Sequence, residues 1–349
     1  MKIGSIPQSL IEWVGLKLEL APRALVDTHI AMLLARTVMA GAELRLFDAL
    51  ARAPLTAEEA AAVCGAAPAG IALLLDALCA CGYLHFANGH FALTRRARRW
   101  LLSGSSSAVN DKLLLQVIEW RWLEGLESFV RTGQPLEFHD SMSAGERELY
   151  HRGMRALAGI AGHEVARRVP LRRGARRMLD LGGSHGHFAA EICRRHPPLS
   201  AEVMDLPEAI EVAAPLLAAE DLGERLVHRV GDAATADLGV EQYDLVLMSN
   251  LAHHLGAEQN RNLAARVARA LKPGGAFVIQ EAARSQRSGE AGQMAALLGL
   301  YFAMQSRPGA RTWTIREMAE WQRSAGLKVR AAKRLRTAPG WVQQSAIRL

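Results

Sequence analysis

A glycine-rich segment is the first feature of this sequence that could do chemistry. Between Asp180 and Gly186 the chain reads DLGGSHG, after a short apolar run and before an amphipathic one. Glycines at a turn from a strand to a helix let the backbone approach a ligand closely, and the helix that follows offers free N–H groups. Ligands of open α/β sheets bind at such carboxyl ends of strands. We therefore expect a nucleoside site, whose contacts in this segment are Asp180, Gly182, Gly183, Ser184 and Gly186.

The segment lacks the known motifs for binding a pyrophosphate. The dinucleotide fingerprint G-x-G-x-x-G does not fit, because the third and sixth positions counted from Gly182 are Ser184 and His187. No lysine of the Walker type follows the glycines either. A site for a pyrophosphate is therefore disfavoured.

Acidic residues follow the next two apolar runs. A carboxylate at Asp205 could accept hydrogen bonds from both ribose hydroxyls, and Asp232 could accept one from an adenine amino group. Helix capping is the alternative role of both. Three acidic strand ends suit a neutral nucleoside with a cationic tail and would repel phosphates. S-adenosylmethionine (SAM) is such a ligand, and its further expected contacts are Leu206, Gly231, Ala233, Ser249 and Asn250.

The elements that must position these residues alternate along the C-terminal half. Short apolar runs are separated by amphipathic helical segments, which predicts βαβ units and a parallel sheet. The expected strands are 178–181, 202–205, 226–230, 243–248 and 276–280. Two last runs, 326–331 and 341–347, could add an antiparallel hairpin at the edge of the sheet.

The N-terminal part has a different, helical pattern. Thr56 can cap a helix to which Glu59 reaches back, and a second helix follows Pro68. Asn88-Gly89 then joins two short strand-like runs, which is a strong hairpin signal. Two helices followed by a hairpin are typical of a winged helix.

Length and composition are consistent with more than one globular domain. The chain has 349 residues, half of them apolar and about a fifth charged. We expect a winged-helix dimerisation domain over 1–105, a helical linker that lines the active site over 106–170, and a cofactor-binding catalytic domain over 171–349. The serine- and glycine-rich segment 103–107 is expected to be a flexible break between the first two.

The same composition bears on the compartment. The first fifteen residues contain no apolar core of a signal peptide, and the most apolar later stretch, 295–304, is too short to span a bilayer. The four cysteines show no spacing typical of metal ligands. We therefore expect a cytoplasmic protein without a membrane partner.

The formal charge of +7 raises the alternative of a DNA-binding regulator that uses the winged helix. Recognition would need arginine or lysine on the second helix of that motif. Residues 71–82 contain neither. We expect no nucleic-acid partner.

The motifs taken together resemble one family, the class I SAM-dependent methyltransferases. The resemblance is to the small-molecule O-methyltransferases of plant phenolic and bacterial natural-product pathways, which carry an N-terminal dimerisation domain. It rests on Leu93-Thr94, the glycine-rich loop, Met204 to Pro207, Gly231-Asp232, Asn250 to His254, and Leu271 to Gly275. It implies an α/β fold, a Rossmann-like doubly wound sheet, preceded by a mainly α-helical winged-helix dimerisation domain in a homodimer.

The resemblance also implies roles for individual side chains. By register, His253 matches the general base that takes the proton of a substrate hydroxyl, with His254 as the alternative. Glu281 matches an acidic residue that orients the base, whereas Ala310 stands where a second acid is expected. This departure leaves N- or C-methyl transfer, or a SAM-binding enzyme that transfers no methyl group, as alternatives. No third metal ligand accompanies the two histidines, so we expect no metal.

The methyl acceptor is the least defined partner. We expect a small aromatic or polyketide-like natural product that offers a hydroxyl. Met294, Tyr301 and Met304 lie in one apolar helical segment and are candidate substrate contacts, although packing in the helix core is the alternative.

Overall fold

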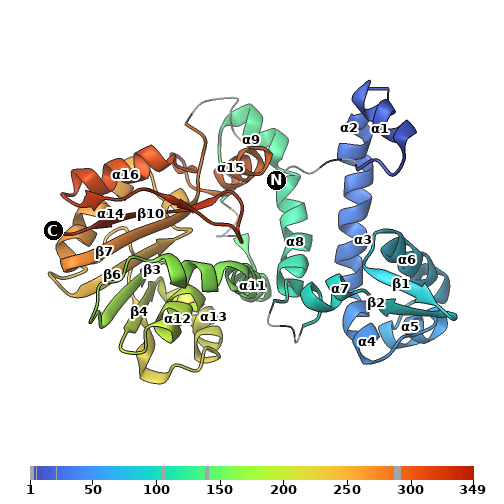
Figure 1. The fold of residues 1–349 in the computed structure, drawn as a ribbon, viewed down its shortest axis with the longest axis horizontal. Coiled ribbons are helices and arrows are strands. Elements are labelled where there is room, and N and C mark those ends of the chain that lie inside the picture. Colours follow the sequence, from blue (N-terminus) through green and yellow to red (C-terminus); the bar gives the residue numbers. More distant parts are fainter. Residues whose placement is uncertain are drawn as a thin grey trace. The chain divides into compact units, whose positions relative to one another are not determined.

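The computed structural model describes residue 4 and the ranges 6–20, 22–103, 105, 107–137, 141–286 and 292–349. The chain forms two compact units that divide between Glu119 and Trp120, and we describe each by itself (Figure 1). The division falls inside one helix, α8 (Asn110–Leu123). The three functional segments expected from the sequence stay a prediction, and two residues of the expected break, 104 and 106, lie outside the described residues.

Helices dominate the N-terminal unit. Its elements before α8 are α1 (Leu10–Lys17), α2 (Arg23–Leu25), the π-helical turn η1 (Val26–Ile30), α3 (Ala31–Glu43), α4 (Leu46–Arg52), α5 (Ala57–Cys64), α6 (Pro68–Ala80), β1 (Leu84–Ala87), β2 (His90–Leu93) and α7 (Arg95–Trp100). A core with Phe47, Leu75 and Leu78 holds the helices together.

Two local predictions for this unit are confirmed. Thr56 accepts a hydrogen bond from the Glu59 N–H while the Glu59 carboxylate accepts one from the Thr56 N–H, so α5 begins with a capping box. β1 and β2 pair antiparallel around Asn88-Gly89. Both turn residues have positive φ, 51° and 79°, which is why asparagine and glycine suit them. The interpretation of this unit as a winged helix stays a prediction.

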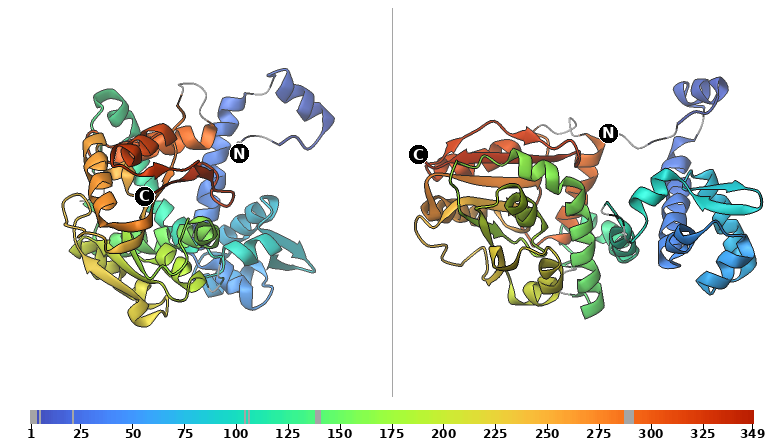
Figure 2. Two further views of the ribbon diagram at one scale, coloured as in Figure 1. Left: turned by 60° about the vertical axis from the view of Figure 1, so that its left-hand side comes forward. Right: turned by 60° about the horizontal axis from the view of Figure 1, so that its bottom comes forward.

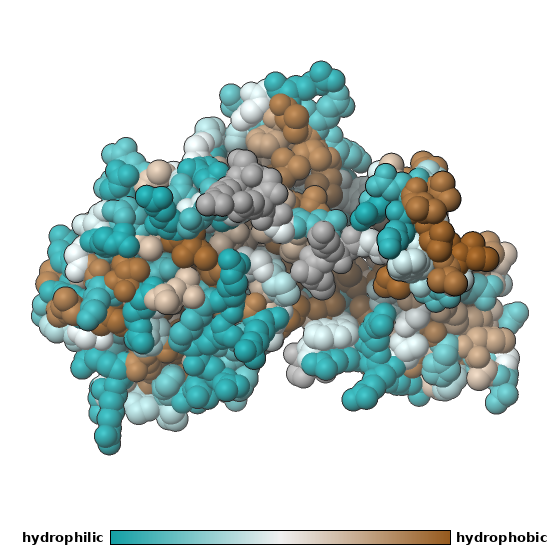
Figure 3. Space-filling model, turned by 45° about the horizontal axis from the view of Figure 1, so that its top comes forward, coloured by the Kyte–Doolittle hydropathy of each residue, from teal (hydrophilic) through white to brown (hydrophobic). Residues whose placement is uncertain are grey.

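The first helices of the unit expose a large apolar surface (Figure 3). The continuous helical stretch Arg23–Glu43 is long and apolar enough to cross a membrane by length and composition, and only 17% of its apolar window is buried. The bent pair α5 and α6 passes the same test only when it is counted as one span. Sequence reasoning overlooked Arg23–Glu43 when it judged only the stretch 295–304.

An eight-stranded mixed sheet forms the centre of the C-terminal unit. Its strands are β3 (Arg177–Leu181), β4 (Ser200–Asp205), β5 (Leu226–Val230), β6 (Tyr243–Ser249), β7 (Leu271–Ala282), β8 (Lys328–Val329), β9 (Lys333–Arg334) and β10 (Trp341–Ile347). Their order is β5-β4-β3-β6-β7-β10-β8, with β9 paired to β10. The first five strands in that order are parallel, as the sequence pattern predicts.

The antiparallel hairpin expected at the edge of the sheet is present. Its run 341–347 is β10, which pairs with β7 on one side and with β8 and β9 on the other. Five of its seven residues are buried, which suits a strand with neighbours on both sides. The segment Leu271 to Gly275 is a bulge at the start of β7, because Tyr243 pairs with Leu271 but Leu245 pairs with Ala276.

Helices cover both faces of the sheet (Figures 1 and 2). The helices of this unit after α8 are α9 (Leu126–Thr132), α11 (Ala144–Arg168), α12 (His187–Arg195), α13 (Pro207–Ala218), the short turns η2 (Gly223–Arg225) and η3 (Ala252–His254), α14 (Ala257–Ala270), α15 (Gln293–Gln305) and α16 (Ile315–Ser324). Successive side chains of β6 point to opposite faces of the sheet. Val246 packs with α14 and α16, whereas Leu245 packs with α11 and α12. The doubly wound α/β fold is thereby confirmed.

A buried carboxylate ties three helices of one face together. Glu220, just after α13, accepts hydrogen bonds from Arg155 of α11 at 3.1 Å and from Arg194 of α12 at 2.8 Å, and contacts His187 Nδ1 at 2.9 Å. Burial alone would raise the pKa of Glu220, but these cations and hydrogen bonds lower it to about 2.

We predict that Glu220→Gln lowers the thermal unfolding midpoint at pH 7. Because the folded pKa is depressed below the ordinary value of 4.5, this carboxylate stabilises the fold above that pH, and the contribution is lost as pH falls toward 2. The gap in unfolding midpoint between the two proteins should therefore narrow below about pH 4.5. Glu224→Gln, at an exposed position nearby, is the control. A gap that does not change with pH would contradict the assignment.

Candidate active site

The glycine-rich loop joins β3 to α12, and its glycines are required by their surroundings. A Cβ on Gly183 would lie 2.6 Å from the Asp180 carboxyl and 2.8 Å from Val203. Gly182 and Gly186 have positive φ, 65° and 69°. A side chain is therefore excluded at Gly183 and disfavoured at Gly182 and Gly186, so backbone atoms form this part of the carboxyl edge of the sheet.

Asp180 lies beneath this loop. It is 1% exposed, and its Oδ1 atom has no hydrogen-bond partner among the described residues. Burial, followed by the nearby charge of Asp205, raises the pKa of Asp180 to about 8. The buried carboxyl is therefore mainly protonated at neutral pH.

The two other acidic strand ends take part in turns. Asp205 accepts hydrogen bonds from the Ser184 and Leu206 N–H groups, each at 2.9 Å, and burial raises its pKa. Asp232 is exposed and accepts one from the Ala234 N–H at 2.8 Å. A carboxylate oxygen has lone pairs for more than one donor, so both can still accept from a ligand.

The remaining predicted cofactor residues follow the same edge. The Gly231 N–H donates to the Asp205 carbonyl at 2.9 Å, and Ala233 is buried just beyond it. At the end of β6, the Ser249 hydroxyl accepts from the Gln280 amide at 3.0 Å. Asn250 is exposed and accepts from the Trp341 indole N–H at 2.8 Å. The loop and these strand ends share the carboxyl edge of the sheet with the predicted catalytic residues His253, His254 and Glu281.

His253 and Glu281 form a buried pair. The imidazole Nδ1 lies 2.8 Å from Glu281 Oε2, and the two residues are 4% and 0% exposed. The other carboxylate oxygen accepts from the Ala252 N–H at 3.1 Å, so Glu281 is itself held in place. With Nδ1–H donated to the carboxylate, Nε2 is the nitrogen left to accept a proton.

Aromatic rings fix the imidazole from the sides. Phe302 of α15 stacks on His253, with ring centroids 4.3 Å apart and an angle of 23° between the planes. His254 is half-buried and its ring centroid lies 4.2 Å from that of His253. In the sequence Phe302 is only an apolar residue of a helical segment, and nothing there marks its contact with His253.

The segment after α15 differs from the family pattern at Ala310, which is buried. Its neighbour Arg311 pairs with Glu317 at 2.8 Å and lies over the Trp313 ring. The Trp313 indole N–H donates to the Ala252 carbonyl at 2.8 Å. The backbone just before His253 is thus held by a side chain far away in the sequence, and no local signal could have revealed this.

The candidate substrate residues line one apolar cavity of about 280 Å³. Met294, Tyr301 and Met304 contribute from α15, which lies beside α9 (Figure 1). The other lining residues are Leu123, Leu126, Leu297, Leu298 and Leu300. Tyr301 in the wall of this cavity contacts Phe302, which also contacts the ring of His253.

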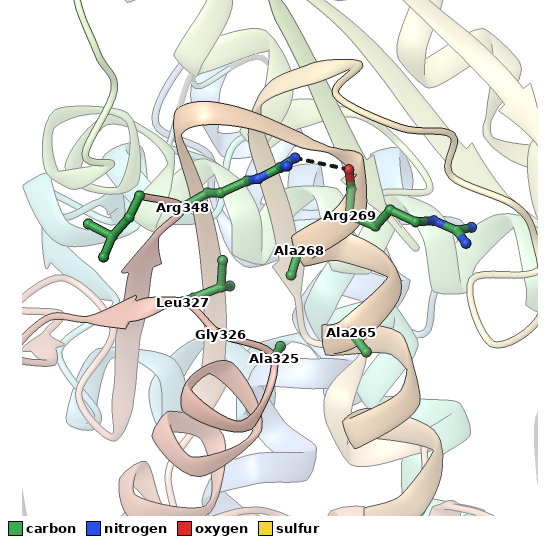
Figure 4. Close-up of a pocket in the computed structure, with 8 residues that line it drawn as sticks. Ala265, Ala268, Arg269, Ala325, Gly326, Leu327 and Arg348 are labelled. Atoms are coloured by element: carbon green, nitrogen blue, oxygen red, sulfur yellow. Dashed lines mark hydrogen bonds between the residues drawn. The ribbon is translucent and has the colours of Figure 1, made fainter.

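A second hollow of about 330 Å³ lies elsewhere, between α14, α16 and the end of β10 (Figure 4). Arg348 crosses it and donates to the Arg269 carbonyl at 3.2 Å. Arg348 also bonds the carbonyl of Leu271, the first residue of β7. This hollow therefore lies at the amino end of the parallel strands, opposite the predicted site.

Two family models match the chain. A model of the O-methyltransferase domain matches residues 128–328, and a model of the O-methyltransferase dimerisation domain matches residues 29–103. The chain belongs to the O-methyltransferase family. It is a SAM-dependent O-methyltransferase with an N-terminal dimerisation domain, and its cofactor is SAM.

The named relatives include O-methyltransferases and an N,N-dimethyltransferase. A 3-hydroxy-5-methyl-1-naphthoate 3-O-methyltransferase of Streptomyces sahachiroi is 29% identical over 318 residues, which are 87% of this chain and 89% of the relative. An N,N-dimethyltransferase of Streptomyces rimosus is 28% identical over 74% of this chain and 78% of the relative. The crystal structure of human N-acetylserotonin methyltransferase in complex with SAM has a TM-score of 0.82, 22% identity, and coverage of 93% of this chain and 97% of that one. At 22% identity, the likeness to the human structure shows a shared fold.

The predicted site residues fit SAM in this structure. The glycines of the loop let its backbone approach a ligand, and the carboxylates of Asp205 and Asp232 suit hydroxyl and amino donors. The Asp180 oxygen that has no partner among the described residues adds a hydrogen-bonding group beneath the loop. That these residues contact the cofactor stays a prediction.

We predict that Asp205→Ala weakens binding of S-adenosylhomocysteine, measured by isothermal titration, by roughly tenfold or more. Hydrogen bonds to a charged group contribute about 1.5–3 kcal/mol, and this change removes them. Glu208→Ala, an exposed carboxylate on α13, is the control and should bind as wild type does. Equal affinity of Asp205→Ala and wild type would remove Asp205 from the cofactor site.

Proposed function

We propose that His253 is the general base that takes the proton of an acceptor hydroxyl during methyl transfer to a small aromatic or polyketide-like natural product. The observation that supports this proposal is the buried contact of 2.8 Å between His253 Nδ1 and Glu281. It selects the tautomer with a free Nε2 lone pair, which is the form that can accept a proton.

Each residue of the site has a separate role in this proposal. Glu281 holds the imidazole in one orientation, and Phe302 limits rotation of the ring. The loop at Gly182 and Gly183, with Asp205, would hold the nucleoside part of the cofactor. When bound, SAM supplies a methyl group on a sulfonium, which leaves readily as a neutral sulfide. Alignment of the acceptor oxygen and removal of its proton are what the protein adds.

The acceptor class is supported by the apolar cavity at α15. Its wall offers leucine and methionine side chains with the single aromatic Tyr301, which suits a flat apolar ring system more than a charged metabolite. The relative from S. sahachiroi carries a hydroxynaphthoate in its name, which is an acceptor of this kind. Met294, Tyr301 and Met304 would contact it.

The dimerisation domain supports a homodimer. Apolar side chains such as Leu33 and Leu34 on α3 are 50% and 43% exposed within one chain, and a second copy would cover them. Sedimentation should give about twice the chain mass of 37.9 kDa. A monomer at micromolar concentration would contradict the proposal. We further expect the enzyme to work in the cytoplasm.

N-methyl transfer is the second candidate function. Ala310 removes the second acidic residue expected near the base, and an amine that is already neutral needs no base. The relative from S. rimosus is named an N,N-dimethyltransferase. O-methyl transfer remains the better-supported reaction because the His253–Glu281 pair is retained.

We predict that His253→Ala lowers kcat by roughly a hundredfold or more, the usual contribution of a positioned base. Affinity for S-adenosylhomocysteine should change by no more than a few-fold, because the expected nucleoside contacts lie at other strand ends. Glu281→Gln should cause a smaller loss of kcat, since the ring stays in place but loses its charged partner. Steady-state kinetics with a hydroxylated aromatic acceptor and calorimetry would measure both quantities.

Two variants control this experiment. His253→Asn keeps a donor toward Glu281 but has no equivalent of Nε2, so it should be as inactive as the alanine variant and more stable. His254→Ala should keep most of the activity. A His253→Ala enzyme with nearly full kcat, or an inactive His254→Ala enzyme beside it, would refute the assignment of the base.

A further inference from the structure

We propose that His151 and His228 are positioning residues of the cofactor loop, which lock Ser184 in the conformation that aims the Asp205 carboxylate at the nucleoside. The inference rests on the proposed placement of SAM at this loop. Neither histidine was singled out in the sequence, since each lies far from the loop along the chain.

Ser184 has a backbone conformation that its side chain disfavours. Its φ is 45°, in the left-handed region where a Cβ crowds the following carbonyl. Glycine would adopt this conformation without strain, and serine stands here among three glycines of the loop. Such a conformation persists only where the surrounding structure holds it.

Every polar group of Ser184 is held by a different element. Its N–H donates to Asp205 Oδ2 at 2.9 Å, at the end of β4. Its carbonyl accepts a hydrogen bond from His228 Nε2 of β5 at 2.8 Å. Its hydroxyl lies 2.5 Å from His151 Nδ1 of α11. Three contacts from three elements thus fix one strained residue.

Helix α11, which carries His151, is itself held in place by contacts with α12 and Glu220. His151 is 8% exposed, and one turn further along α11 Arg155 bonds Glu220, which also contacts His187 at the start of α12. A Cβ on Gly162 would lie 3.0 Å from the His187 ring, so α11 and α12 pack closely. The helix is therefore tied to the two ends of the segment from Ser184 to His187.

The consequence reaches the cofactor through Asp205. The N–H of Ser184 is one of two backbone donors that orient this carboxylate, the other being Leu206. If Ser184 relaxes toward another conformation, its N–H turns away and Asp205 loses its orientation. Loss of His151 should therefore appear as weaker nucleoside binding, with less effect on overall stability.

The test compares S-adenosylhomocysteine binding by isothermal titration for paired substitutions. His151→Leu should raise Kd roughly five- to tenfold, as expected for one lost hydrogen bond. His151→Asn, whose amide can occupy the place of Nδ1, should stay within twofold to threefold of wild type. His163→Leu, an exposed histidine on the same helix, should not differ from wild type. Equal Kd values for the leucine and asparagine variants of His151 would overturn the proposal.

A double-mutant cycle tests whether His151 acts through Ser184. Ser184→Ala keeps the Cβ but removes the hydroxyl, so it should weaken binding as His151→Leu does. The double variant should then lose little more than either single variant, because both remove the same contact. At the other histidine, His228→Gln should bind more tightly than His228→Leu, since the glutamine amide can replace Nε2 as donor. If the fold-changes in Kd of the two single variants multiply in the double variant, His151 does not act through Ser184.

Asp205→Ala separates failure of this inference from failure of the proposed site. If Asp205→Ala binds as wild type does, SAM does not bind at this loop, and the placement itself is wrong. If Asp205→Ala weakens binding while His151→Leu does not, the placement stands and the positioning role of His151 is overturned. Thermal unfolding midpoints of all variants, measured in parallel, show whether each protein is folded under the titration conditions.

Discussion

The close approach of the loop backbone to Asp180 is the constraint on which the site depends. Since a Cβ at Gly183 would overlap the Asp180 carboxyl and Val203, the turn from β3 into α12 has no room for a side chain at that position. That same packing buries Asp180 and raises its pKa to about 8. The edge of the sheet therefore offers a bare polar backbone over a neutral carboxyl, beside the carboxylate of Asp205.

The three acidic residues at this edge differ in burial and in hydrogen bonding. Asp180 is buried and mostly protonated, Asp205 is held by two backbone N–H groups, and Asp232 is exposed in its own turn. A ligand at this edge would meet the oxygens of these carboxyl groups as hydrogen-bond acceptors, which suits a nucleoside without phosphates. The His253–Glu281 pair lies on the far side of β6, where the proposed base would take the proton of the acceptor.

The sequence predicted most of the fold but less of the site. The alternation of apolar runs with helical segments predicted the parallel strands, Thr56 and Glu59 predicted the capping box, and Asn88-Gly89 predicted the hairpin. Each of these features depends on residues that are close together along the chain. The interior place of β10 depends on pairing with distant strands. The same holds for the Trp313 contact with the Ala252 carbonyl, the stacking of Phe302 and the contact of His151 with Ser184. Such tertiary partners leave no periodic trace in one sequence.

The bond between Trp341 and Asn250 gives this enzyme an optical reporter of its own. The indole N–H at the start of β10 donates to the side chain of Asn250 at the carboxyl end of β6. Indole emission depends on the polarity around the ring and on the partner of its N–H group. A ligand that draws the Asn250 side chain away would change the contribution of Trp341 to the emission of the seven tryptophans, and a Trp341→Phe variant would identify that contribution without any attached label.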